Sequence, residues 1–516
     1  MTAAAPRPIR FVFRGAVVEV PAGEATRSVL QWLREDARAC GTKEGCAEGD
    51  CGACTVLVAE LAEAVVATPT ETDGGPPGPG TRAVVSQGLA LRPVNACIRF
   101  LPTLDGKALL TVEDLAEGER LHPAQQALVD CHGSQCGFCT PGFVMTLAAL
   151  HERHAGQGSR PARAELSDEL AGNLCRCTGY RPILAAGQQM FDTPGPRLPL
   201  AALRAPLQAL QAHAPLQWPG RYHAPRSLAE LAGLRLARPQ ARLLAGATDV
   251  GLWVTKQLRE LGELIWLGDV AELRRLAVLD GALHIGAAVV LEDAWAALAG
   301  HWPALREMGQ RFAGPPVRHA GTLVGNLANG SPIGDSAPVL MALGATLLLR
   351  RGEASRELPL DAFYLDYMKN QLRAGEFIEA VRVPLASAVP GSGWVVQAHK
   401  LSKRSDCDIS ALSAGFALRL SAGQVAEVRL AYGGMAATVR RAAAAEAALR
   451  GQPWCEATLA AAQAALQAEF TPLTDLRASA GYRRQAAAAL LHRLWLATRP
   501  SQPLPPEALS LRAGAT

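Results

Sequence analysis

Ten of the 12 cysteines lie within the first 177 residues, where their spacing could hold metal. A first set follows the pattern Cys-x4-Cys-x2-Cys with a distant fourth member: Cys46, Cys51, Cys54 and Cys97. Soft thiolates suit iron–sulfur clusters, and this spacing is that of the plant-type [2Fe–2S] pattern. The loop is rich in glycine, which would let backbone N–H groups turn toward an anionic cluster. A structural zinc site, which prefers Cys-x2–4-Cys pairs, is the alternative.

A second set comprises Cys136-x2-Cys139 and Cys175-x-Cys177. Its one-residue gap is tight for zinc but tolerable for two irons bridged by sulfide, and zinc or ordinary packing remains the alternative. Thr140 and Pro141 are typical of a helix N-cap and first helical residue, so we expect a positive helix terminus near these thiols. Four cysteines outside both sets are expected to be small buried hydrophobic residues: Cys40, Cys131, Cys407 and Cys455.

Two segments after residue 200 could bind a nucleotide, although the sequence has neither the Rossmann Gly-x-Gly-x-x-Gly nor a phosphate-binding Gly-x4-Gly-Lys-Ser/Thr loop. Residues 243–251 pass from an apolar strand through small residues into a helical run, which can offer backbone N–H groups to a pyrophosphate. Residues 321–335 are dense in small and hydrogen-bonding side chains. The alternatives are an ordinary strand-to-helix turn and a long structural turn, respectively.

Several domains must position these residues, since a chain of 516 residues predicts roughly three or four. The net charge of +4 is small and no block of Lys or Arg stands out, so the composition does not support binding to nucleic acid or to a membrane surface. We find no apolar run long enough for a membrane span and no apolar secretory signal. Clustered thiols fit a reducing compartment, and we therefore expect the cytoplasm.

The hydrophobic pattern predicts the order of the elements. Residues 71–82 are of low complexity and are expected to form a flexible surface insertion, and the Pro-rich residues 193–215 are expected to form a linker. Predicted strands cover residues 9–13, 17–20, 55–58, 395–399, 416–420 and 428–432, and predicted helices begin near residue 29 and cover 123–131, 141–153, 165–171, 442–450 and 456–470.

Residues 42–55, 132–143 and 172–182 resemble the cluster-binding segments of the xanthine dehydrogenase / aldehyde oxidase family of molybdenum hydroxylases. The triplet Asn95-Ala96-Cys97 matches the context of that family's distant ligand of the first cluster. Residues 243–251 and 321–335, in this order, resemble the family's FAD domain. His399–Ile409 resembles its segment beside the flavin, and Tyr432–Ala436 its C-terminal domain. Residues 60–82 depart from the family's compact pattern.

The resemblance implies two [2Fe–2S] clusters and FAD as cofactors of this chain. The implied metal ligands are Cys46, Cys51, Cys54, Cys97, Cys136, Cys139, Cys175 and Cys177. Phe312 would stack on the isoalloxazine ring, Lys400 would stabilise negative charge on the reduced ring, and Asp408 would tune it. The implied FAD-binding residues are Leu243, Leu244, Ala245, Gly246, Ala247, Thr248, Asp249, Val250, Phe312, Thr322, Gly325, Asn326, Asn329, Ser331, Asp335, Lys400 and Asp408.

The resemblance also implies a multidomain α+β fold. It predicts a β-grasp, ferredoxin-like [2Fe–2S] domain over residues 1–100 and a helical [2Fe–2S] domain over 101–192. After the linker at 193–215, it predicts an α+β FAD-binding domain of the vanillyl-alcohol-oxidase type over 216–390. A small α+β flavoprotein C-terminal domain completes the chain over 391–516.

The order of these domains implies the small, iron–sulfur/FAD subunit of a xanthine dehydrogenase, with no residue on this chain that hydroxylates the substrate. By the resemblance, a partner subunit holding molybdopterin oxidises hypoxanthine or xanthine to urate. Electrons would then pass through both clusters to FAD and on to NAD. We expect an α2β2 heterotetramer. The alternatives are a subunit of a related molybdenum hydroxylase acting on an aldehyde or N-heterocycle, and a non-redox zinc protein.

Overall fold

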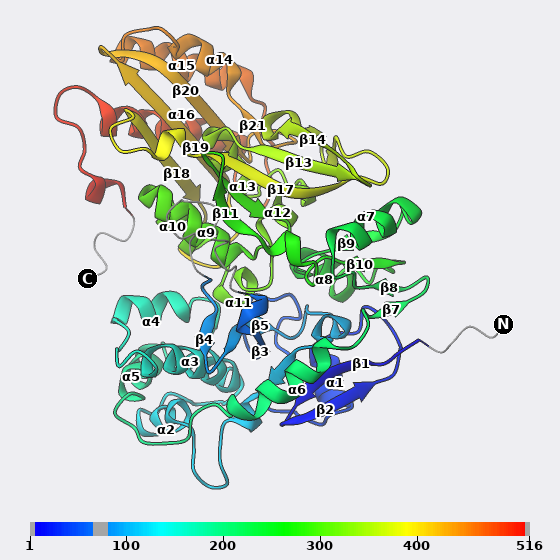
Figure 1. Ribbon diagram of the computed structural model, residues 1–516. Coiled ribbons are helices and arrows are strands. Elements are labelled where there is room, and N and C mark those ends of the chain that lie inside the picture. Colours follow the sequence, from blue (N-terminus) through cyan, green and yellow to red (C-terminus); the bar gives the residue numbers. More distant parts are fainter. Residues whose placement is uncertain (1–5, 66–80, 511–516) are drawn as a thin grey trace.

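A computed structural model of the chain describes residues 6–65 and 81–510. The elements up to residue 211 occupy the lower part of Figure 1, and most of the later elements form the upper part. Part of the insertion predicted at 71–82 lies outside the described residues. No helix within the described ranges is long and apolar enough to cross a bilayer.

The first unit is a mixed sheet with a helix packed on it, in the strand order β2-β1-β6-β3-β5-β4. Strands β1 and β6 pair in parallel, and the other neighbours are antiparallel. Phe11 and Phe13 meet Trp32 of the helix edge-on, at 5.0 and 5.3 Å between ring centroids. The hairpin and helix predicted from the sequence are confirmed. The bounds are β1 (Ile9–Phe13), β2 (Ala16–Val20), α1 (Val29–Glu35), β3 (Thr55–Leu61), β4 (Val84–Ser86), β5 (Leu89–Asn95) and β6 (Ala108–Leu110).

The second unit is helical, and α3 is buried along most of its length. The predicted N-cap of this helix is wrong by one residue, because Cys139 occupies the N-cap position and Thr140 is already helical. The Thr140 hydroxyl lies 2.8 Å from the Ser134 hydroxyl and does not cap the backbone. The bounds are α2 (Pro123–Asp130), α3 (Thr140–Ala155), α4 (Arg163–Glu169) and α5 (Arg181–Gln189).

The segment predicted as a linker contains a packed helix, α6 (Ala201–Gln211). Leu203, Leu207 and Leu210 on this helix are buried in the same apolar cluster as Val12 of β1 and Leu57 of β3. The connection between the lower and upper parts of the molecule is therefore held against the first sheet, and it does not hang free (Figure 1).

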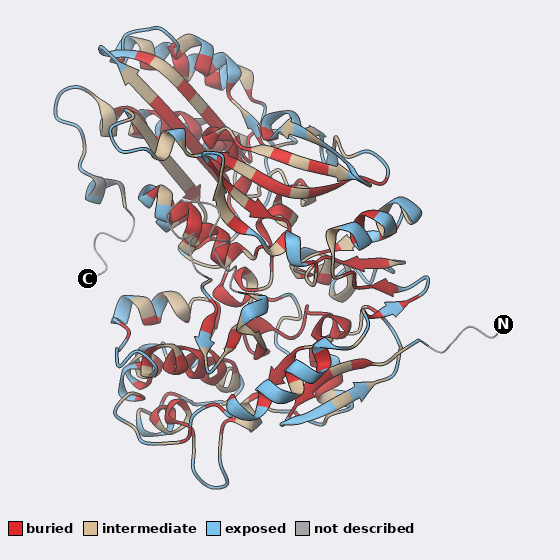
Figure 2. Ribbon diagram, viewed as in Figure 1, coloured by how far each residue is buried: buried red, intermediate tan, exposed pale blue. Residues whose placement is uncertain are grey.

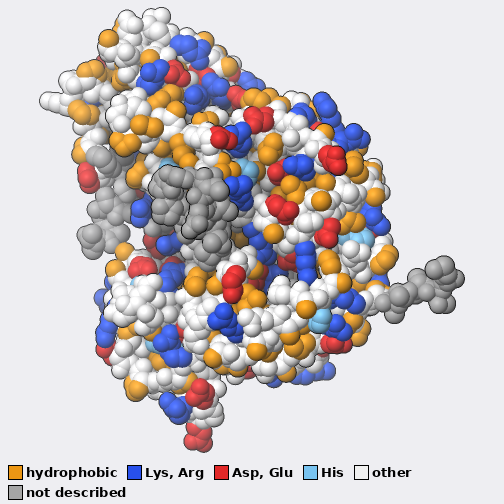
Figure 3. All heavy atoms as spheres, viewed as in Figure 1, with side chains coloured by type: hydrophobic (Ala, Val, Ile, Leu, Met, Phe, Trp, Pro, Cys, Tyr) orange, Lys and Arg blue, Asp and Glu red, His pale blue; other side chains and the backbone are white. Residues whose placement is uncertain are grey.

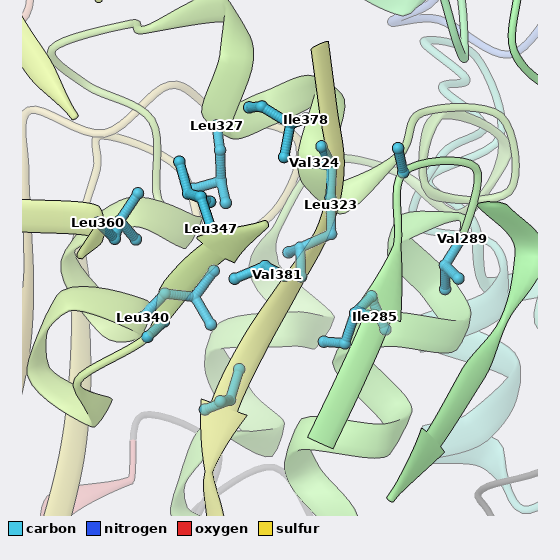
Figure 4. Packing of buried hydrophobic residues seen from close by; sticks show 14 of the residues in the cluster. Ile285, Val289, Leu323, Val324, Leu327, Leu340, Leu347, Leu360, Ile378 and Val381 are labelled. Carbon is cyan, nitrogen blue, oxygen red and sulfur yellow. The ribbon is translucent and has the colours of Figure 1, made fainter. Parts of the chain in front are cut away.

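The third unit contains two sheets, ordered β7-β8-β10-β9 and β11-β12-β17-β13-β14. Figure 4 shows Leu323, Val324 and Leu327 of α12 lying among Leu347 and Val381 of the second sheet. The bounds are β7 (Gln217–Trp218), β8 (Tyr222–His223), α7 (Leu228–Ala237), β9 (Arg242–Leu244), α8 (Thr248–Thr255), β10 (Leu264–Trp266), β11 (Leu276–Leu279), β12 (Ala282–Gly286), α9 (Leu291–His301), α10 (Arg306–Arg311), α11 (Pro315–Arg318), α12 (Leu323–Asn329), α13 (Ser336–Leu343), β13 (Thr346–Arg351), β14 (Ala354–Pro359), β15 (Tyr364–Asp366), β16 (Lys369–Asn370) and β17 (Phe377–Pro384).

The last unit is an antiparallel sheet, β18-β19-β20-β21, covered by helices on one face. Its predicted strands and the helices near 442–450 and 456–470 are confirmed. The buried residues lie on the inner faces of the sheets (Figure 2). The bounds are β18 (Trp394–Leu401), β19 (Leu412–Ser421), β20 (Gln424–Gly433), β21 (Arg440–Arg441), α14 (Ala443–Leu449), α15 (Glu456–Glu469) and α16 (Ala480–Thr498).

Candidate functional site

The first set of thiols gathers on the loop between α1 and β3, and its distant member arrives from the end of β5. The Cys46 thiol is in hydrogen-bonding contact with those of Cys51 and Cys97, and Cys97 also contacts Cys54. The backbone N–H groups of Glu48 and Cys51 each donate to the Cys46 sulfur at 3.4 Å. These contacts lower the pKa of Cys46, although burial opposes the effect. The loop therefore supplies both thiols and N–H donors at one place.

The second set gathers at the start of α3, where Cys139 contacts Cys175 and Cys136 contacts Cys177. Burial raises the pKa of Cys139 to about 12, and the neighbouring Cys175 adds to the effect. Within the described ranges, no three or more His, Cys, Asp or Glu side chains gather tightly enough to hold one metal ion. Thiols that meet in pairs fit a two-iron cluster, in which two cysteines bind each iron.

The expectation for the four remaining cysteines is wrong in part. Cys40 and Cys455 are exposed, and Cys131 and Cys407 are partly buried. The Cys407 thiol donates to the carbonyl oxygen of Ala171 at 2.9 Å, so it joins the last unit to the helical unit.

The two thiol sets are joined through backbone. Leu174, which precedes Cys175, donates its N–H to the carbonyl oxygen of Cys51 at 2.9 Å. The Asn173 side chain donates to the carbonyl oxygen of Gly52 at 3.1 Å. Gly52 has a φ of +69°, and a Cβ there would lie 2.2 Å from the carbonyl oxygen of Gly172. Only glycine allows this close approach, so the sequence of the first loop fixes its contact with the second unit.

A cavity of about 720 Å³ lies beside the first thiol loop, and the predicted nucleotide-binding segments line it. Of the 17 predicted FAD-binding residues, Leu244 is not in the lining, because its side chain is wholly buried in the core around Trp266. The volume is within the range of about 300–1,000 Å³ found for small-molecule and cofactor sites. The cavity therefore has room for an extended nucleotide ligand.

The turn between β9 and α8 forms one wall of the cavity. Ala247 occupies the N-cap of α8 with a φ of +61°, and no side chain caps this helix. A Cβ on Gly246 would lie 2.3 Å from the carbonyl oxygen of Ala320, so the turn packs directly on neighbouring backbone. An uncapped helix N-terminus leaves N–H groups available to an anionic group such as a pyrophosphate.

The start of α12 forms a second wall. The Thr322 hydroxyl accepts a hydrogen bond from Gly325 N–H at 3.0 Å. The Asn326 Oδ1 atom is buried and has no hydrogen-bond partner among the described residues, although the side chain lines the cavity. Across the cavity, the Asn329 amide donates to Asp249 at 2.9 Å. Burial raises the pKa of Asp249. An unpaired buried polar atom on a cavity-lining side chain is a feature that calls for a further partner, such as a bound ligand.

Lys400 is engaged within the wall. Its Nζ donates to Asp335 at 2.6 Å and to the Ser410 hydroxyl at 2.9 Å, and Ser410 in turn donates to Asp335 at 2.6 Å. All three side chains are buried. The positive charge of Lys400 is thus already paired with a carboxylate.

Phe312 and Asp408 also line the cavity. Phe312 is the C-cap residue of α10. The Arg318 guanidinium donates to the carbonyl oxygens of Phe312 and Ala313 at 3.2 and 2.8 Å. Burial opposes ionisation of Asp408, but backbone N–H groups of Arg404 and Ile409 and the guanidinium of Arg404 together lower its pKa. Sequence reasoning missed Arg318, which holds Phe312 without lining the cavity itself.

Part of the first thiol loop belongs to the cavity wall. Glu48, Gly49 and Asp50 lie between Cys46 and Cys51, and together with Ile98, which follows Cys97, they line the cavity. Burial raises the pKa of Asp50. Sequence reasoning missed these residues, because their distance along the chain from residues 243–410 gives no sign of proximity.

Comparison with known families matches most of the chain to described domains. Residues 111–188 match the [2Fe-2S] binding domain. Residues 215–386 match the FAD binding domain in molybdopterin dehydrogenase, and residues 397–498 match the CO dehydrogenase flavoprotein C-terminal domain. The match to a [2Fe-2S] domain favours iron over zinc for the second set.

Similar proteins include two xanthine dehydrogenases. The one from Emericella nidulans is 31% identical over 94% of this chain, and the one from Drosophila subobscura is 31% identical over 91%. This chain spans only 38% of either relative. The structure of carbon monoxide dehydrogenase from Hydrogenophaga pseudoflava is 29% identical, with a TM-score of 0.49 over 55% of this chain and 96% of that one.

Proposed function

We propose that this chain is the electron-transfer subunit of a xanthine dehydrogenase, a molybdenum hydroxylase; its matched iron–sulfur and FAD domains and its relatives support this proposal. Its two [2Fe–2S] clusters would relay single electrons, and FAD would collect pairs of them for delivery to NAD. The partner subunit would hold molybdopterin and oxidise hypoxanthine or xanthine to urate.

The residues present fit these cofactors. Cys46, Cys51, Cys54 and Cys97 would hold one cluster, and the second thiol set would hold the other. The turn at Gly246 and Ala247 would receive the diphosphate of FAD, because backbone N–H groups at a helix N-terminus favour anions. The unpaired Oδ1 of Asn326 would accept a hydrogen bond from the ligand. Phe312, held by Arg318, would present its ring to the isoalloxazine.

One observation carries the proposal: residues 48–50 of the first thiol loop are also part of the cavity wall. The hydrogen bond from Leu174 to Cys51 joins the second thiol set to the same loop. The first thiol loop therefore contacts both the cavity and the segment that carries the second thiol set, and Ala171 of that segment accepts a hydrogen bond from the cavity-lining Cys407. Close contact among all three suits a chain that passes electrons between bound carriers.

The xanthine substrate is supported by the named relatives, two xanthine dehydrogenases at 31% identity, whereas NAD and the partner rest on the resemblance of the cluster and flavin segments. This chain spans 38% of the length of either relative, and we propose that a molybdopterin-binding partner carries out substrate hydroxylation. We propose an α2β2 assembly in the cytoplasm. The remaining alternative is a related molybdenum hydroxylase that acts on an aldehyde or another N-heterocycle.

The test is to purify the chain with whatever partner accompanies it and to measure its metal, flavin and activity. We expect about four irons and one FAD per chain and reduction of NAD by xanthine. Activity with aldehydes alone would favour the alternative substrate class while leaving the cofactor assignment intact. A colourless protein that contains zinc and no flavin would overturn both.

A further inference from the structure

A second cavity, of about 100 Å³, lies where the first sheet meets the third unit. Its lining includes Glu60 of β3, Lys107 before β6, Trp266 of β10 and Arg274. The space far exceeds the roughly 10–15 Å³ that one water needs, but it is well below the volume of a typical cofactor site. Ala245 and Thr322 line both this cavity and the larger one, so the two cavities share a wall.

The charged groups around this cavity form three ion pairs. Lys107 Nζ lies 2.8 Å from Asp269, Arg274 Nη1 lies 3.0 Å from Glu60, and Arg92 Nη2 lies 2.5 Å from Asp293. Each pair joins the first unit to the third, and two longer contacts, from Lys107 to Glu60 at 4.0 Å and from Arg274 to Asp269 at 3.6 Å, lie within a unit. Each of these carboxylates is therefore already bonded to a cation.

A fourth cation, Arg99, is left over. Its side chain lines the cavity, is 8% exposed, and makes no hydrogen bond or ion pair with the described residues. The carboxylates that act on it at longer range, Glu60 and Asp269, belong to the pairs above. The indole N–H of Trp266, also in the lining, is buried and has no partner among the described residues. His319 adds no further positive charge, because burial lowers its pKa well below the usual value.

We propose that this cavity binds one small monovalent anion, such as chloride, between the Arg99 guanidinium and the Trp266 N–H. A buried cation without a partner is unfavourable, and one negative charge would balance the single surplus positive charge among the described residues. N–H donors are the groups that bind an anion, and both side chains belong to the lining of this cavity. The anion would stabilise the contact between the first unit, to which Arg99 belongs, and the third unit, to which Trp266 belongs.

Crystals of the full chain, with its cofactors, soaked in bromide give a direct test. We expect an anomalous peak within hydrogen-bonding distance of Arg99 and Trp266. A structure at comparable resolution with only waters in the cavity, in the presence of bromide, would overturn the proposal.

Solution measurements give a second test through Arg99→Met, which removes the surplus charge and keeps much of the side-chain volume. At constant ionic strength, replacing gluconate with chloride should raise the Tm of the wild type by about 2 °C or more. The Arg99→Met variant should lose this dependence. Arg120→Met, which removes an exposed guanidinium that is not part of the cavity lining, serves as the matched control and should keep the chloride dependence. Equal chloride dependence in all three proteins would contradict the proposal.

Discussion

Single side chains in the cavity wall already have partners before any ligand binds. Lys400 was predicted to face negative charge on a reduced flavin, yet its ammonium is bonded to Asp335 and Ser410. A paired ammonium exerts a weaker field than an isolated one, so the role predicted for Lys400 depends on how the pair responds to FAD. The thiols of the two sets, in contrast, mainly contact one another, so we expect a substitution of one of them to act directly on metal binding.

Replacing Cys175 with alanine removes one thiol of the second set. We expect the iron content to fall from about four to about two per chain, because a [2Fe–2S] cluster needs four ligands. Reduction of FAD by the substrate of the partner subunit should be lost, whereas NADH should still reduce it. Metal analysis and flavin absorbance during anaerobic reduction would measure both effects.

The matched control is Cys131→Ala, because Cys131 lies in the same helical unit but outside both thiol sets. Its iron content and turnover should equal those of the wild type. Unimpaired turnover of Cys175→Ala would refute the assigned path.

At the scale of elements, the turn from β9 to α8 depends on the absence of a side chain at Gly246. Gly246→Ala would place a Cβ 2.3 Å from the carbonyl oxygen of Ala320, so the turn must shift. We expect FAD to be lost from this variant while iron is retained, because the thiol loops lie on other elements. Gly233→Ala is the control, since a Cβ there meets nothing within 4 Å and the residue lies within α7. Normal flavin content in Gly246→Ala would contradict the assigned diphosphate site.

The elements also show what the sequence could and could not predict. Strands β1, β2 and β3 and helices α2 to α4 were predictable, because their apolar periodicity and flanking turn residues agree with the final packing. Helix α6 was missed because Pro206 and the flanking prolines are typical of a linker, whereas tertiary packing of three leucines stabilises it. The thiol spacings predicted which cysteines lie together. Contacts across the chain, such as Gly49 and Asp50 beside the FAD segments, leave no local pattern.

At the scale of the whole molecule, partly buried ion pairs join the first sheet to the third unit. Positive and negative side chains are interspersed over the face shown in Figure 3, and the pairs of Glu60 with Arg274 and of Arg92 with Asp293 lie between the two units. Burial would raise the pKa of Glu60, but Lys107, Arg274 and Arg99 outweigh it and lower the pKa to about 2. The ionised form of Glu60 is therefore favoured in the folded protein.

This shift makes the interface sensitive to acid. The unfolded pKa of Glu60 is 4.5 and the folded one about 2, so its contribution is fully present above about pH 5 and declines as the pH falls toward 2. The difference between these two pKa values corresponds to roughly 3 kcal/mol of folding stability. Because the Glu60 side chain is 19% exposed and solvent screens its charge, its contribution is about 2 kcal/mol. Glu60→Gln should lower the free energy of unfolding by about this amount at pH 7, and by progressively less below pH 5.

Urea unfolding of the two proteins between pH 7 and pH 3.5 would measure the difference. Glu63→Gln is the control, because Glu63 is exposed and lies 3.5 Å from the half-exposed Arg204. Its effect should be small at every pH. A constant difference between Glu60→Gln and the wild type across this range would rule out the proposed linkage.

The packing of α6 against the first sheet has a consequence for electron transfer through this molecule. In some redox proteins a domain on a flexible linker moves between donor and acceptor, and a viscous solvent slows that motion. Here the connecting helix is anchored by Leu203, Leu207 and Leu210, so no such excursion is available to it. If the two clusters and FAD are held at fixed distances from one another, anaerobic reduction of the flavin by substrate should proceed at the same rate in buffer made viscous with sucrose as in buffer without it. A rate that falls in proportion to viscosity would reveal a hinge that the anchored helix does not permit.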